Sequence, residues 1–158
     1  MSPETHTIMR VTRTKVQAKA SYDRMSRFYD LLAGGSERKV RNLALQQLHI
    51  RRGESVLEIG FGTGAGLVQM AEAVGEDGRV YGIDISSGML RASRGRLEKA
   101  GLADRVALTC DDALHMPYTD DQFEAVFMSF ALELFDSPEI PQVLLECRRV
   151  LRAGGRIP

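Results

Sequence analysis

The sequence predicts an α/β protein built on a Rossmann-like, doubly wound and mostly parallel sheet. Short apolar or β-branched runs alternate with segments of helical periodicity along most of the chain, as expected for strands that alternate with helices. A glycine-rich turn at residues 60–66 follows the first apolar run, and the second run ends in Asp84, about twenty residues later. This spacing is typical of a βαβ unit whose first turn binds a nucleotide-like ligand.

The part of the chain before the first strand predicts an arm and two helices. Residues 1–15 are polar and aperiodic, which predicts a flexible arm. Apolar side chains at helical spacing predict a helix over about residues 22–32, which a Gly-Gly pair then ends. A second amphipathic helix is expected over about residues 36–48. Its apolar face contains Val40, Leu43, Ala44 and Leu48.

The remaining elements alternate in the order that a doubly wound sheet requires. Strands are expected near residues 55–59, 79–84, 106–110 and 125–129. Helices are expected near residues 64–74, 87–100 and 138–151. The last helix is marked by Ser137 as its N-cap, by Pro138 at its first position and by Gly154 past its end.

Composition limits the class of protein. With 158 residues, the chain has a common single-domain size. Its 21 basic and 21 acidic residues balance, so the charge does not indicate a nucleic-acid partner. The sequence lacks a membrane-spanning apolar run and a secretory signal, and we expect a cytoplasmic protein. Cys110 and Cys147 predict reduced, buried thiols, because they fit neither a disulfide framework nor a metal site.

The glycine-rich turn indicates a ligand without phosphate. Missing side chains at Gly60, Gly62 and Gly64 let the backbone turn sharply and let a ligand approach it closely. The carboxylate of Glu58, just before the turn, would repel a pyrophosphate and attract a cationic ligand. A looser dinucleotide fingerprint also fits this spacing, with Ala65 in the third glycine position. The glycine spacing by itself therefore leaves both ligand classes open.

Asp84 has two interpretations. At the end of the second strand it is expected to bind the ribose hydroxyls of a ligand. It would alternatively be an N-terminal acid of the following helix, which Ser86 could cap equally well. We favour ribose binding, because the glycine turn and the acid lie at βαβ spacing.

Several motifs together resemble the class I S-adenosylmethionine-dependent methyltransferases, and among them the ubiquinone/menaquinone-biosynthesis-like group. They are VLEIGFGTG at residues 56–64, YGIDISSGML at 81–90, DDALHMPYTDDQFEAV at 111–126 and RRVLRAGGRI at 148–157. Two Tyr-Asp pairs, at residues 22–23 and 29–30, resemble the first helix of that family. The resemblance covers the chain from about residue 20 onward and implies that residues 16–158 form a domain that binds S-adenosyl-L-methionine.

The resemblance implies a set of cofactor-binding residues. The glycines would line the methionine part, Asp84 would hold the ribose, and an Asp-Ala pair would meet the adenine. The full set is Tyr29, Glu58, Gly60, Phe61, Gly62, Thr63, Gly64, Asp84, Ile85, Met89, Asp112, Ala113, Ser129 and Phe130. The cofactor carries a sulfonium and an ammonium but no phosphate, which suits a site rich in acids.

No catalytic residue or metal is assigned by the sequence. His115 lies near the expected mouth of the site, and Glu133 follows the fourth strand, where the family presents residues toward the methyl group. We interpret both as surface residues rather than as a substrate ligand and a general base. The acceptor is expected to be a small, apolar or aromatic molecule, and the methylated atom is not indicated.

The C-terminal segment departs from the family pattern. Residues 152–158 lie where the family begins its fifth strand, and the usual family sheet has three more strands. We therefore expect a sheet that ends after about the fourth strand and exposes residues 125–128 as an apolar edge. A second copy of this chain in a homodimer or another partner chain is expected to cover that edge, and the alternative is that nothing covers it because the sequence is a fragment.

Three functions follow from these observations. The first is an S-adenosylmethionine-dependent methyltransferase. The second is a cofactor-binding but catalytically incomplete chain that needs a partner. The third and least favoured is a nicotinamide-dependent oxidoreductase, which Glu58 and the Asp112–Ala113 pair argue against.

Overall fold

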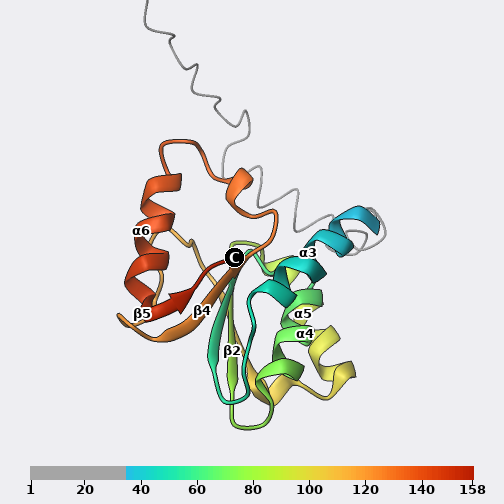
Figure 1. Ribbon diagram of the computed structural model, residues 1–158. Coiled ribbons are helices and arrows are strands. Elements are labelled where there is room, and N and C mark those ends of the chain that lie inside the picture. The colour runs from blue at the N-terminus through green and yellow to red at the C-terminus, as the bar shows by residue number, and fades with distance from the viewer. Residues whose placement is uncertain (1–34) are drawn as a thin grey trace, which may run out of the picture.

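The computed structural model describes residues 35–158, and these residues form a five-stranded sheet flanked by helices (Figure 1). Every neighbouring pair of strands is parallel. The strand order is β3-β2-β1-β4-β5, so the chain reverses direction across the sheet between β1 and β4. The predicted α/β, Rossmann-like fold is confirmed. The predicted arm, residues 1–15, and the predicted helix that contains Tyr29 lie outside the described residues.

The bounds of most elements match the expectation. The elements are α3 (Gly35–Gln47), β1 (Ser55–Ile59), α4 (Ala65–Val74), β2 (Arg79–Asp84), α5 (Ser87–Ala100), η1 (Ala103–Arg105), β3 (Val106–Cys110), β4 (Phe123–Met128), η2 (Leu132–Leu134), α6 (Ile140–Val150) and β5 (Leu151–Arg156). Strands β1 to β3 have the predicted bounds, and β4 begins two residues earlier than predicted.

Alternating side chains of the strands build a core on each face of the sheet. Val56 and Phe127 pack with α3, α4 and α5 on one face, whereas Leu57 and Val126 pack with α6 on the other. Figure 1 shows the same division, with α6 on the opposite side of the sheet from α3, α4 and α5. Because both faces are covered, the central strands are mostly apolar. For this reason they can be recognised as strands in the sequence.

The sheet does not end after its fourth strand, so this expectation was wrong. Strand β5 pairs with β4 at Phe123↔Leu151 and Ala125↔Arg156, with an irregular register between these two points. Residues 153–155, Ala-Gly-Gly, have little intrinsic strand propensity. The strand is instead fixed at its end by the Arg156 side chain, as described next. The pairing with β5 reaches Ala125, and residues 125–127 of β4 are fully buried, so the expected exposed apolar edge is not observed over these residues.

Arg156 ties β5 to the turn between α3 and β1. Its Nε donates to the carbonyl oxygen of Leu48 at 2.9 Å, and its Nη2 lies 2.6 Å from Oε2 of Glu54. The side chain of Glu54 is only 10% exposed. A partly buried, charge-assisted pair of this kind is stronger than a neutral hydrogen bond. This single side chain therefore holds the C-terminal strand against the part of the chain that precedes the sheet.

Two predicted helix features differ from the structure. Helix α6 begins at Ile140, with Glu139 rather than Ser137 at the N-cap position, because residues 136–139 form a turn in which Glu139 N donates to Asp136 O at 2.7 Å. Gly154, expected just past the helix, lies within β5.

The predicted apolar face that begins in helix α3 is only partly confirmed. Leu48 is buried and Ala44 packs against the core as predicted, whereas Val40 is 53% and Leu43 60% exposed. Leu45, which was not predicted, is buried instead. Arg41 is partly buried. It lies four residues before Leu45 and seven before Leu48, and residues at that spacing share one side of a helix. The face that meets the body of the protein therefore carries a cation, which the apolar pattern of the sequence did not predict.

The two cysteines differ in exposure. Cys147 is buried as predicted, and burial raises the pKa of its thiol to about 11. Cys110, at the end of β3, is exposed, so the expectation that both thiols are buried was wrong. The residue occupies the last position of its strand, where the chain leaves the core. No helix among residues 35–158 is long and apolar enough to cross a membrane.

Candidate functional site

The candidate site lies at the carboxyl end of the sheet. Because the strands are parallel, the turns that follow β1, β2, β3 and β4 all meet at this edge. Open α/β sheets bind ligands there, and most of all beside the point where the strand order reverses. That point is between β1 and β4. The predicted cofactor residues from Glu58 to Phe130 fall on or near these turns or on the helices that follow them.

The three motif glycines adopt left-handed conformations for different reasons. Gly60, Gly62 and Gly64 have φ angles of 70°, 53° and 84°. A Cβ atom added to Gly60 would lie 2.6 Å from Cβ of Ala131, and one added to Gly64 would lie 2.9 Å from Cβ of Ser93. A Cβ atom at Gly62 would meet no atom within 4 Å. Gly62 therefore borders open space, whereas the other two glycines make room for neighbouring elements of the fold.

Asp84 links the two turns of the βαβ unit. Its Oδ2 accepts a hydrogen bond from Gly62 N at 3.0 Å, and its Oδ1 accepts one from Ser86 N at 2.9 Å. Ser86 caps α5, since its Oγ accepts from Met89 N at 3.1 Å. The capping role considered for Asp84 therefore belongs to Ser86. The carboxylate of Asp84 holds the glycine turn in place and remains partly exposed at the site.

Glu58 is a buried carboxyl group at the floor of the site. The residue is 3% exposed, and burial raises the pKa of its side chain well above 4.5, with a smaller contribution from the charge of Asp84 and an opposing one from Arg41. Its Oε1 would lie 2.5 Å from a Cβ atom at Gly66, so a side chain at position 66 would require the Glu58 carboxyl group to move. Within the described residues, Oε2 is buried and has no hydrogen-bond partner. A cationic ligand group would stabilise the ionised form of this carboxyl.

The turn after β3 carries the predicted Asp-Ala pair. Oδ1 of Asp112 accepts a hydrogen bond from Leu114 N at 3.0 Å, and Ala113 is buried against the core on the α6 side. Asp111 in turn accepts from Asp112 N at 2.8 Å. These local bonds shape the turn, but the structure also fixes it from outside through α6.

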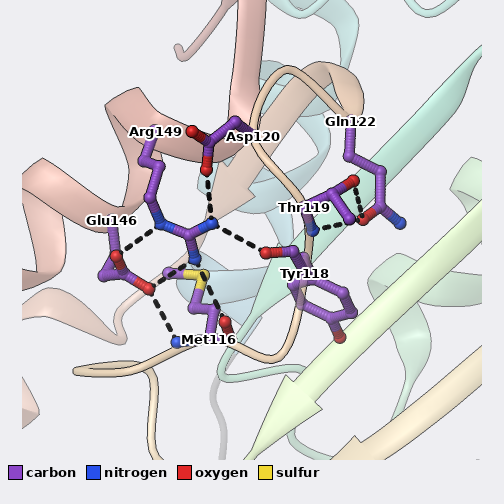
Figure 2. A network of polar contacts seen from close by, with 7 residues as sticks. All are labelled: Met116, Tyr118, Thr119, Asp120, Gln122, Glu146 and Arg149. Carbon is purple, nitrogen blue, oxygen red and sulfur yellow. Dashed lines mark hydrogen bonds and ion pairs between the residues drawn. The ribbon is translucent and has the colours of Figure 1, made fainter.

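Arg149 of α6 holds the turn after β3, as Figure 2 shows. Its guanidinium donates to the carbonyl oxygens of Met116 and Tyr118 at 3.1 and 2.7 Å, and to Oδ1 of Asp120 at 2.9 Å. It also pairs with both carboxylate oxygens of Glu146, at 2.7 and 2.8 Å. Glu146 Oε2 accepts in addition from Met116 N at 2.7 Å. Three of the five hydrogen bonds of the arginine therefore hold the segment after β3, and the other two hold Glu146 on the same helix.

Glu146 and Arg149 were missed by the sequence analysis. The pair is an acid and a base three residues apart on one helix, a spacing that signals a side-chain contact. Arg149 also lies inside the motif at residues 148–157. What the sequence did not indicate was the partner, because the turn lies about thirty residues earlier in the chain.

The other predicted residues fall into two groups. Phe61 and Met89 are buried in the core, so their side chains support the site from beneath. Thr63 is buried, Ile85 and Ser129 are partly exposed, and Phe130 is 38% exposed with a φ of 55°. A positive φ is costly for a bulky residue and marks a constrained turn after β4. The surface residues His115 and Glu133 are both exposed, in agreement with their interpretation.

Comparison with known proteins identifies the class. The sequence pattern described as a methyltransferase domain matches residues 56–155, which contain all of the turns described above. The chain therefore belongs to the methyltransferase domain family, as a class I, S-adenosylmethionine-dependent member. This membership decides against the nicotinamide-dependent oxidoreductase.

Individual relatives agree with this assignment. The chain is 34% identical over 155 residues to the ubiquinone/menaquinone biosynthesis C-methyltransferase UbiE of Azotobacter vinelandii. The matched region is 98% of this chain and 59% of the relative. It is 34% identical over 139 residues to a demethylmenaquinone methyltransferase of Symbiobacterium thermophilum, covering 85% of the chain and 55% of the relative. The chain thus spans somewhat more than half the length of these relatives.

A solved structure shows the same fold with the same cofactor dependence. The crystal structure of a SAM-dependent methyltransferase from Aquifex aeolicus has a TM-score of 0.65 and 25% identity, covering 85% of this chain and 67% of that one. The family and this neighbour give S-adenosylmethionine as the cofactor. The residues fit it, since Gly62 borders open space and the buried Glu58 suits a cation.

Proposed function

We propose that this protein is an S-adenosylmethionine-dependent methyltransferase acting on a small apolar or aromatic acceptor, with a quinone-type ring as the best candidate. The observation that carries the proposal is the site at the carboxyl end of the sheet, where Gly62 leaves space at the backbone, Glu58 precedes the turn and Asp84 accepts a hydrogen bond from Gly62 N. The quinone-type acceptor follows from the names of the relatives.

Different predicted residues would bind different parts of the cofactor. Asp84 would accept from the ribose hydroxyls, the turn at Asp112 and Ala113 would meet the adenine, and Gly62, Thr63, Ser129 and the residues beside them would border the methionine part. Bound S-adenosylmethionine supplies an electrophilic methyl group on a positively charged sulfur. The protein would contribute orientation and exclusion of water, which lower the barrier by removing the entropy cost of bringing the reactants together.

A second candidate function is cofactor binding without methyl transfer. It is favoured by one observation, that the chain spans 59% and 55% of the two relatives described above. The domain proposed to bind the cofactor, residues 16–158, holds every site residue named here. The cytoplasmic location and the lack of a nucleic-acid partner stay predictions from composition. The homodimer or partner chain also stays a prediction from the sequence. The edge of β4 on which it was predicted is paired with β5 at Phe123 and Ala125.

Titration with S-adenosylhomocysteine and with NAD tests the cofactor, and an Asp84→Ala variant tests the site. We expect the chain to bind S-adenosylhomocysteine and not NAD, and the variant to bind at least tenfold more weakly, because a hydrogen bond to a charged group is lost. The variant should also be less stable to urea, since Asp84 holds the backbone of Gly62 and Ser86. Asp104→Ala is the control, because Asp104 is exposed and precedes β3 at the opposite end of the sheet.

Methyl transfer is measured separately, with labelled cofactor and a demethylmenaquinone analogue. Transfer by the pure chain supports the enzyme. Binding without transfer supports the cofactor-binding chain. If Asp84→Ala binds as tightly as the wild type while folded, Asp84 does not contact the cofactor.

A further inference from the structure

The last glycine of the turn makes room for a buried hydroxyl group. Gly64 has no side chain, and a Cβ atom there would lie 2.9 Å from both Cβ and Oγ of Ser93. Ser93 belongs to α5 and is fully buried. A hydroxyl group buried in this way needs a hydrogen-bond partner. Its partner is the turn itself, since Oγ of Ser93 donates to the carbonyl oxygen of Gly62 at 2.7 Å.

Both backbone groups of Gly62 are therefore held by side chains from other elements. Its N–H donates to Oδ2 of Asp84 at the end of β2, and its carbonyl oxygen accepts from Ser93. The position of its missing side chain is open space, because an added Cβ atom would meet no atom within 4 Å. The residue of the turn that leaves room for a ligand is thus also the residue whose backbone is fixed on both sides.

The bond to Ser93 controls the peptide group between Gly62 and Thr63. This peptide is trans, so its carbonyl and its N–H point in opposite directions, and the N–H of Thr63 points away from Ser93. Glycine moves between backbone conformations at little cost, so the surrounding side chains must fix the orientation of this peptide. Without the hydroxyl group, the carbonyl oxygen could rotate toward the open space. It would then occupy part of the site and repel an anionic group of a ligand.

We propose that Ser93 is a positioning residue for the cofactor, because its hydroxyl group locks the Gly62–Thr63 peptide in the orientation that keeps the open side of Gly62 unobstructed. This inference rests on the proposed function and adds to it a residue of α5 that lies outside every motif of the sequence analysis. It also explains the absence of a side chain at Gly64, which lets Ser93 reach the turn. The lock exists before the cofactor binds, so binding does not have to order this peptide.

A Ser93→Ala variant tests the lock. It removes only the hydroxyl group and places a strong helix former in α5, so the variant should fold. We expect it to bind S-adenosylhomocysteine about fivefold more weakly, which is the factor that one ordinary hydrogen bond contributes. Binding of 5′-methylthioadenosine, which lacks the amino-acid group, should change by less than twofold, because Gly62 is proposed to border the methionine part. In NMR spectra of the ligand-free variant, the amide signals of Gly62 and Thr63 should shift or broaden.

Leu97→Val is the matched control. Leu97 is buried one turn after Ser93 on the same helix, so its replacement should lower the free energy of unfolding and change neither the affinities nor the two amide signals. An equal loss for both ligands in Ser93→Ala, or the same loss in Leu97→Val, would show that Ser93 merely supports the fold, and would overturn the inference. Unchanged binding of S-adenosylhomocysteine or unchanged amide signals in Ser93→Ala would overturn it as well. A wild-type chain that binds neither ligand would overturn the proposed function itself, which is a distinguishable result.

Discussion

Replacement of Arg149 by methionine should destabilise the part of the site that follows β3. The side chain of Arg149 is 31% exposed and donates five hydrogen bonds, of which three join α6 to the segment that contains Met116 and Tyr118 and two go to Glu146 on the same helix. Methionine keeps the aliphatic length of the side chain but none of its donors. The turn would then keep only one of the side-chain links to α6 described for Arg149 and Glu146, the bond from Met116 N to Glu146.

The size of the effect follows from the exposure of each partner. Asp120 is 73% exposed, so its ion pair contributes about 0 to 1 kcal/mol. Water can replace Arg149 at the two backbone carbonyls, which limits each of those bonds to about 1 kcal/mol. Glu146 is only 11% exposed and loses a two-pronged charged partner, which costs about 1.5 to 3 kcal/mol. Because these contributions are not additive, we expect a total loss of about 2 to 4 kcal/mol.

Urea unfolding measures this loss, with Arg148→Met as the control, since Arg148 is the exposed neighbour on the same helix. The amide of Met116 should exchange with solvent faster in Arg149→Met, and the affinity for S-adenosylhomocysteine should fall because the turn holds Asp112. A change in the free energy of unfolding below about 0.5 kcal/mol would refute the proposed role, since this is the range of ordinary surface substitutions.

The dependence of stability on pH gives an independent check of the ion pair between Glu146 and Arg149. The hydrogen bond with Arg149 holds the pKa of Glu146 below its usual 4.5. A lowered carboxyl pKa in the folded state stabilises the protein above the ordinary pKa and loses that contribution as the pH falls through the lowered value. The difference in the free energy of unfolding between wild type and Arg149→Met should therefore have its largest value above pH 4.5 and should become smaller as the pH falls below it. A difference that does not depend on pH would argue against the ion pair as its source.

Two further predictions follow from the packing. Gly62→Ala should weaken cofactor binding and should lower the free energy of unfolding by about 1 to 2 kcal/mol, because alanine tolerates the positive φ poorly. Gly64→Ala should lower it by about 2 to 4 kcal/mol, because the added Cβ also meets Ser93. The reverse order of the two losses in urea unfolding would contradict these roles. Cys110 should react with a thiol reagent in the folded protein, and Cys147, buried and with a pKa of about 11, only on unfolding; equal rates would contradict the packing.

The sequence alone determined the fold class and indicated where the candidate site lies. Central parallel strands are covered on both faces, so they are short, continuous apolar runs in the sequence. Such runs can be recognised as strands without knowledge of the tertiary structure. The glycine turn and Asp84 are equally local, because a left-handed turn needs glycine at fixed positions and the acid follows at the spacing of a βαβ unit. For this reason β1, β2 and β3 have the predicted bounds.

The features that depend on contacts between distant segments of the chain were decided only by the tertiary structure. Strand β5 has a weak local signal and is fixed by Arg156, whose partner Glu54 lies 102 residues earlier in the sequence. The inward face of α3, with Arg41, is chosen by packing against α4 rather than by the apolar pattern. Whether each motif glycine borders a ligand or a neighbouring side chain likewise depends on residues such as Ala131, about seventy residues away from Gly60. Local propensity carries no information about such partners, because they become neighbours only when the chain folds.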